Sequence, residues 1–60
     1  MKVLTLIELM RMTRIELTDL AARITNALPD YPESSDDYAN ARINLRNIRR
    51  VLARRDLAPP

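Results

Sequence analysis

The chain has 60 residues, and its ten basic and eight acidic side chains give a formal net charge of +2. It contains no cysteine and no histidine, which excludes disulfides, thiolate nucleophiles and a structural zinc site. A chain of this length buries only about 60% of the surface that its unfolded form exposes. A small domain without disulfides or a metal needs self-association or an unusually good core, and we favour self-association. We therefore expect one small domain over residues 1–60 that associates with itself.

The composition indicates an all-α fold. Apolar residues make up 47% of the chain, yet glycine, Phe and Trp are absent, and the only aromatic residues are Tyr31 and Tyr38. Folds rich in β-structure usually need turn glycines and β-branched or aromatic strands. No run approaches the roughly 20 apolar residues that cross a bilayer, and the start lacks a signal-peptide pattern. A cytoplasmic location is the default expectation.

The first expected element is a long helix over about residues 3–28, a range without any glycine or proline. Apolar positions recur there at alternating steps of three and four, which places them on one helical stripe. The stripe comprises Val3, Leu6, Met10, Thr13, Leu17, Leu20, Ile24 and Ala27. Because the spacing continues without a slip, we favour a single helix about 39 Å long.

The stretch TLIELMRMTRIEL offers a competing interpretation of the same segment. It contains Thr-x-Ile-Glu-Leu twice, at residues 5–9 and 13–17. Each copy places Glu three residues after Thr, which is the pattern of a capping box at a helix start. The second copy allows a kink or a break near residues 12–13, which would give three helices. A strand over residues 2–12 is a weaker third option, because strand alternation would place Glu8 on the apolar face.

A proline-bounded link is expected over residues 29–35. Pro29 and Pro32 cannot continue a helix, since proline lacks the N–H and restricts the residue before it. Ser34 or Ser35 offers an N-cap for the next helix. The acidic residues that follow suit the first turn of that helix.

The second expected helix covers about residues 36–56, and residues 57–60 form a tail. Its apolar seam also follows alternating steps of three and four, and it consists of Tyr38, Ala41, Leu45, Ile48 and Leu52. Helices joined by a short link pack as antiparallel neighbours. The expected fold is therefore an antiparallel helical hairpin.

The expected self-association surface lies on the N-terminal half of the first helix. Leu4, Met12 and Ile15 occupy the side opposite the stripe, whereas the corresponding positions beyond residue 16 are polar. A contiguous exposed apolar face usually marks an interface, and a two-fold dimer is the commonest assembly. We expect this face to join two hairpins into a four-helix bundle.

The second helix also carries an arginine face. It comprises Arg42, Arg46, Arg49, Arg50 and Arg54, which fall within an arc of about 140° and extend over about 18 Å. The arc is bordered by Asn40, Asn44 and Asn47, whose amides suit base edges or solvent. Planar guanidinium groups suit phosphates and carboxylates.

The arginine face predicts a non-enzymatic regulatory protein that binds nucleic acid. The alternative is a protein-interaction adaptor or inhibitor, which uses the N-terminal apolar face or the arginine face against an acidic protein partner. A solvated helix end accounts for the same clustering, because the helix dipole favours cations near the C-terminus.

No enzyme, cofactor, metal or small-molecule substrate is expected. A chain without glycine has no Gly-rich phosphate loop. The carboxylates of Asp30, Glu33, Asp36 and Asp37 lack the spacing of a calcium-binding loop. We interpret them as helix caps, or as a patch for the arginine face of a second molecule. With two tyrosines as the only aromatics, base-stacking platforms are not expected.

Overall fold

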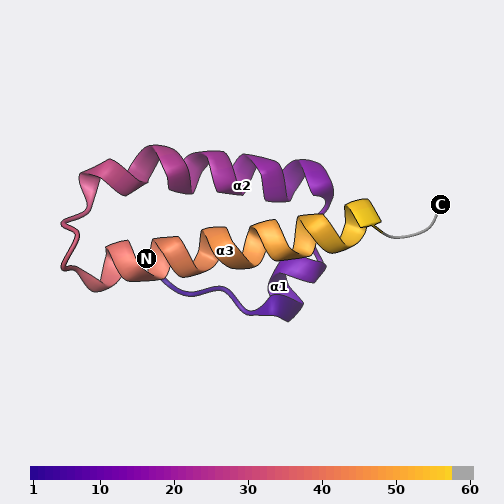
Figure 1. The fold of residues 1–60 in the computed structure, drawn as a ribbon, viewed down its shortest axis with the longest axis horizontal. Coiled ribbons are helices and arrows are strands. Elements are labelled where there is room, and N and C mark those ends of the chain that lie inside the picture. The colour runs from indigo at the N-terminus through magenta and orange to yellow at the C-terminus, as the bar shows by residue number, and fades with distance from the viewer. Residues whose placement is uncertain (58–60) are drawn as a thin grey trace.

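The computed structural model describes the backbone of residues 1–57 and the side chains of residues 1–55. The described residues form α1 (Leu6–Met10), α2 (Arg14–Ala27), the 3-10 helix η1 (Leu28–Asp30) and α3 (Asp36–Leu57). This part of the chain contains no strand, which confirms the all-α prediction. Figure 1 shows α3 in the middle, with α2 along one side and the N-terminal segment and α1 along the other.

The helix α3 agrees closely with the expected second helix. Ser35 is its N-cap, because the Ser35 hydroxyl accepts a hydrogen bond from the backbone N–H of Tyr38 at 3.1 Å. Two acidic residues occupy the first turn, where the helix dipole favours negative charge. The helix extends to Leu57, so residues 58–60 of the expected tail lie outside the described residues.

The prediction of a single long helix over residues 3–28 is wrong. The chain instead has the break near residues 12–13 that the competing interpretation allowed. Thr13 leaves the helical conformation, with φ −72° and ψ 165°, and caps α2. Its hydroxyl accepts from the Glu16 N–H at 3.1 Å, while its own N–H donates to the Glu16 carboxylate at 3.0 Å. This capping box gives each of these two backbone N–H groups a hydrogen-bond partner. The described residues thus form three α-helices where two were expected.

The first copy of the repeat is also a helix start. The Thr5 hydroxyl accepts a hydrogen bond from the Glu8 N–H at 3.1 Å and caps α1. At the other end of α1, the Arg11 N–H donates to the Ile7 carbonyl. Three residues therefore separate α1 from α2, which is enough to change the direction of the chain.

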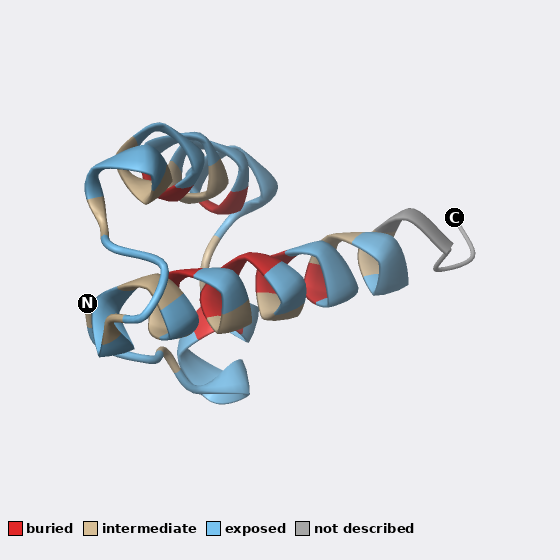
Figure 2. Cartoon of the chain, turned by 60° about the vertical axis from the view of Figure 1, so that its left-hand side comes forward, coloured by how far each residue is buried: buried red, intermediate tan, exposed pale blue. Residues whose placement is uncertain are grey.

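The break also changes which side of α1 is buried. Leu9 is fully buried, whereas the stripe positions Val3, Leu6 and Met10 are exposed. Beyond the break, Leu17 and Ile24 are buried as the stripe predicts. The buried core consists of Leu9, Leu17, Ile24, Ala41, Leu45, Ile48 and Val51. Figure 2 shows that α3 supplies most of this core, while its outer side is exposed.

The N-terminal segment is fastened along α3 by polar side chains. Asn40 donates from Nδ2 to the Met1 carbonyl, and Asn44 donates from Nδ2 to the Lys2 carbonyl, both at 2.8 Å. The Met1 amino group forms an ion pair with Asp37. The segment thus runs in the same direction as α3 and delivers α1 to the C-terminal half of that helix. Among the described helices, none has the length and apolar content that crossing a membrane requires.

Candidate functional site

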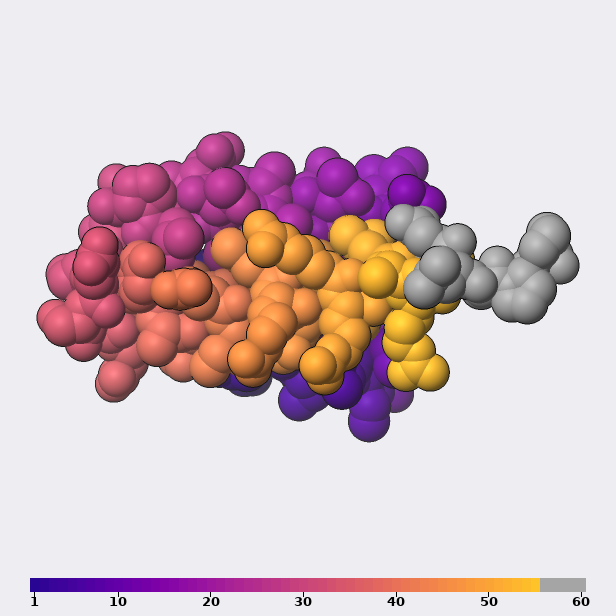
Figure 3. All heavy atoms as spheres, viewed as in Figure 1, coloured from indigo at the N-terminus to yellow at the C-terminus, as the bar shows by residue number. Residues whose placement is uncertain are grey.

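The five arginines of the predicted arginine face are all exposed on α3. Among the described side chains, none of the five forms an ion pair or a hydrogen bond. Arg42 contacts an aromatic ring, since its guanidinium carbon lies 5.9 Å from the centre of the Tyr38 ring. Figure 3 shows that neither α2 nor α1 covers the side of α3 that faces the viewer. These cations are therefore accessible to an anionic partner.

The structure divides the five arginines between two hollows. The first, which we call the basic hollow, is an open depression of about 770 Å³ beside α3. It is lined by Arg42, Arg46, Arg49, Leu28, Tyr38, Ile43 and Leu45. Three arginines therefore line one concave surface together with apolar side chains, an arrangement that suits a row of phosphates or carboxylates.

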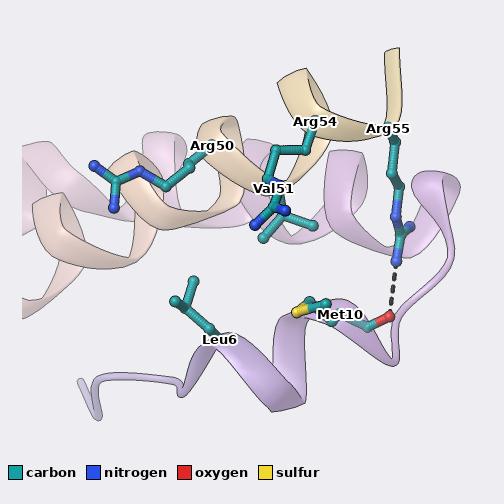
Figure 4. Close-up of a pocket in the computed structure, with 6 residues that line it drawn as sticks. All are labelled: Leu6, Met10, Arg50, Val51, Arg54 and Arg55. Atoms are coloured by element: carbon teal, nitrogen blue, oxygen red, sulfur yellow. Dashed lines mark hydrogen bonds between the residues drawn. The ribbon is translucent and has the colours of Figure 1, made fainter. Parts of the chain in front are cut away.

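The second hollow, which we call the α1–α3 groove, lies between α1 and the C-terminal half of α3. It has a volume of about 310 Å³ and is lined by Leu6, Met10, Arg50, Val51, Arg54 and Arg55. Figure 4 shows Leu6 and Met10 on α1 opposite Val51 and Arg54 on α3. The groove is thus apolar along its walls and cationic along one edge.

Arg55 also lines the α1–α3 groove, and the sequence prediction did not include it. Its Nη2 atom donates a hydrogen bond to the Met10 carbonyl at 2.8 Å, as the dashed line in Figure 4 shows. A cation is favourable at that position, because the last carbonyls of a helix lack partners and carry partial negative charge. Arg55 therefore holds the end of α1 against α3. The signal in the sequence was an arginine in the last turn of the second helix.

The three predicted self-association residues do not share one exposed face. Leu4 and Met12 are partly buried and pack against the core, whereas Ile15 is 75% exposed on α2. The physical reason is the break at residues 11–13, which turns α1 relative to α2. Three other exposed large apolar side chains of the described residues lie on α1, at Leu6, Ile7 and Met10.

The asparagines that were expected to border the arginine arc have another role in two cases. Asn40 and Asn44 bind the backbone of the N-terminal segment, so their amides are not available to bases. Asn44 is 1% exposed. Every buried side-chain polar atom in the described residues has a hydrogen-bond partner.

The carboxylates do not gather into a metal site. Within the described residues, no group of three or more potential ligands is placed to hold a metal ion. Asp30, Glu33 and Asp36 are exposed near the link between α2 and α3. The capping hydrogen bonds from the Thr13 backbone and side chain lower the pKa of Glu16 below its usual value. That shift belongs to helix capping and gives no sign of acid–base chemistry.

The described side chains thus offer two candidate binding surfaces, a basic one and an apolar one with a cationic edge. No family model, no curated protein and no solved structure matches this chain.

Proposed function

We propose that this protein is a small non-enzymatic binding protein that acts as a dimer and binds the phosphates of nucleic acid through the basic hollow. The observation that carries the proposal is the set of three exposed arginines, Arg42, Arg46 and Arg49, without an anionic partner on one concave surface.

The spacing of these arginines fits a phosphate backbone. Arg42, Arg46 and Arg49 extend over about 10 Å along α3, since each helical residue rises by about 1.5 Å. A nucleic-acid strand carries one phosphate for about every 3.4 Å of its axis, so the row spans about three phosphates. The contact with Tyr38 restrains Arg42, which reduces the entropy that its side chain loses on binding.

The local sequence gives these arginines no acidic partner on α3. None of the positions three or four residues from Arg42, Arg46 or Arg49 is acidic, so none can form the stabilising helical ion pair. Arg42 and Arg46 are four residues apart, as are Arg46 and Arg50, and like charges at that spacing destabilise a helix by a few tenths of a kcal/mol. Because these arginines are present although they destabilise the helix slightly, we infer that they have a role in binding.

The test is a titration with short duplex DNA and duplex RNA over a range of salt concentrations. Three phosphate contacts predict that log K falls against log[salt] with a slope of about −2.7 for each protomer, because each contact contributes about −0.9. The triple variant Arg42→Ala/Arg46→Ala/Arg49→Ala should lose this binding. Its matched control is Lys2→Ala/Arg11→Ala/Arg23→Ala, which removes three exposed cations elsewhere and should retain most of it.

Two results would contradict the proposal. One is the absence of detectable binding to either duplex at about 50 mM salt, where phosphate contacts are strong. The other is equal weakening by the triple variant and by its control, since binding would then depend on net charge and not on the basic hollow.

The second candidate function is a protein-interaction adaptor. It is favoured by the exposed apolar side chains of α1, which lie beside the arginines of the α1–α3 groove. Protein interfaces combine such an apolar centre with arginine at the edge. Failure of nucleic-acid binding together with a stable protein contact at α1 would favour this candidate.

A further inference from the structure

We infer that the α1–α3 groove is the surface through which two copies of this chain associate, and that the acidic start of α3 in the second copy contacts its cationic edge. The two α3 helices then lie antiparallel about a two-fold axis. This inference rests on the dimer that the proposed function includes, and it is independent of nucleic-acid binding.

The apolar side chains of α1 that line the groove remain exposed in a single copy of the chain. Leu6 and Met10 are 46% and 60% exposed, and with Val51 they form the walls of the groove. Val3 is also exposed, and its neighbours in the chain, Lys2 and Leu4, are bound to Asn44 of α3. Exposed apolar residues therefore extend from the middle of α3 to its C-terminal half. A small domain gains stability when a second copy covers such a surface.

The chain also carries a negative charge that can pair with the arginines of the groove. Asp36 begins α3 and Arg54 lies 18 positions later. At about 100° per residue these positions are five full turns apart, so both lie on one side of α3, about 27 Å from each other. Neither side chain has an ionic partner among the described residues. This side of α3 is therefore anionic at one end and cationic at the other.

An antiparallel second copy pairs both ends at once. When the two-fold axis crosses this side of α3 at the level midway between Asp36 and Arg54, each Asp36 faces the Arg54 of the other copy. Arg50 then faces the level of Asn40, where the nearby Met1 amino group is already paired with Asp37. Val3 lies near the axis and meets its own counterpart. The contact is closed and self-complementary, as a two-fold dimer requires.

Other pairings of the same surface are less favourable. A parallel arrangement, or a two-fold axis through the groove itself, places Arg50 and Arg54 against the same residues of the second copy. Like charges that face each other across an interface disfavour association. The acidic start of α3 is the part of the chain that avoids this repulsion.

The experiment is a charge exchange, read by sedimentation equilibrium. In homodimers of Asp36→Arg, both end contacts become pairs of cations, and in homodimers of Arg54→Asp both become pairs of anions. Each single variant should raise the dimer dissociation constant about tenfold, through two altered ion pairs. An equimolar mixture of the two variants restores opposite charges at both ends and should return the dissociation constant to within about threefold of the parent value. Helix content by circular dichroism verifies that each variant remains folded.

The matched controls are Asp19→Arg and Arg23→Asp, which make the same charge changes at exposed positions of α2 and should leave the dissociation constant unchanged. A parent chain that remains monomeric at millimolar concentration overturns the inference, and so does a dimer that tolerates both single exchanges. Weakening by the single variants without recovery in the mixture overturns the antiparallel arrangement. The dimer should persist in the Arg42→Ala/Arg46→Ala/Arg49→Ala variant, so a failure of nucleic-acid binding is recognised separately.

Discussion

Asn44 on α3 accepts a hydrogen bond at Oδ1 from the backbone N–H of Leu4, 40 positions earlier in the chain, at a distance of 2.8 Å. Its Nδ2 atom donates to the Lys2 carbonyl at the same distance. One buried amide thus binds the backbone on both sides of Val3. Because the N-terminal segment leads directly into α1, this side chain helps to set the position of the α1–α3 groove.

We predict that Asn44→Ala lowers the free energy of unfolding by about 1–3 kcal/mol, the cost of leaving buried polar groups without partners. Urea denaturation followed by circular dichroism measures this loss. In native-state hydrogen exchange, the Leu4 amide should also lose its protection. The matched control is Asn47→Ala, since Asn47 is partly buried and makes no hydrogen bond among the described side chains. Its effect should stay within about 0.5 kcal/mol, and equal losses in the two variants would contradict the proposed role of Asn44.

The neighbours Leu9 and Met10 test the orientation of α1. Leu9 is fully buried and Met10 is 60% exposed, whereas the three-four stripe placed Met10 inside. Leu9→Ala should cost about 2–5 kcal/mol of unfolding free energy, as large-to-small changes in a core do. Met10→Ala should cost less than about 0.5 kcal/mol if the chain is monomeric under the assay conditions. The opposite ranking in urea denaturation would mean that α1 buries the side that the stripe predicted.

The sequence predicted α3 well because all of its signals agree. Two prolines precede it, Ser35 caps it, and its seam residues Ala41, Leu45 and Ile48 are buried. The first helix was mispredicted because two signals disagreed there. The unbroken three-four spacing of apolar residues favoured one helix. That spacing shows only where side chains would lie if the backbone stayed helical. The hydrogen bonds of the Thr13 capping box decide the backbone itself.

The candidate site was predicted in part, and the missing part depends on tertiary contacts. Periodicity along α3 was sufficient to expect Arg42, Arg46 and Arg49 on the surface. The division of the arginine face into two hollows depends on α1, which reaches α3 through Asn44 and Arg55. A helical wheel of either segment alone does not contain that information. For the same reason, the burial of Leu4 and Met12 was not foreseen.

Thr13 gives a test of the break itself. Thr13→Ala removes the hydroxyl that accepts from the Glu16 N–H, and loss of an N-cap costs about 1 kcal/mol. The same change at Thr5 should cost less, because α1 has only five residues and its cap lacks the reciprocal hydrogen bond that the Thr13 capping box has. Urea denaturation of the two variants compares them directly. A cost at Thr13 that is indistinguishable from zero would favour a continuous helix through this position.

The capping box also predicts a pH dependence. The hydrogen bonds from Thr13 hold the pKa of Glu16 below its usual value, so the ionised carboxylate is favoured in the folded state. Its stabilising effect is fully present above the unfolded pKa and is lost as the pH falls through the folded pKa. In an NMR titration, the Thr13 amide shift should follow this carboxylate, with a midpoint below the usual pKa of a glutamate side chain.

The variant Glu16→Gln keeps an acceptor oxygen but cannot ionise, so its unfolding free energy should fall less than that of the parent between about pH 5 and pH 3.

Glu8→Gln is the matched control. Glu8 occupies the equivalent place in the first repeat, but no hydrogen bond joins its carboxylate to Thr5 in the described contacts. This variant therefore makes the same chemical change without removing an acceptor of a capping hydrogen bond. In the Thr13→Ala background the difference between Glu and Gln at position 16 should shrink, because the hydroxyl half of the reciprocal pair is gone and the two effects are coupled. A pH dependence that is unchanged by Glu16→Gln would show that other carboxylates, and not the capping box, account for the loss of stability in acid.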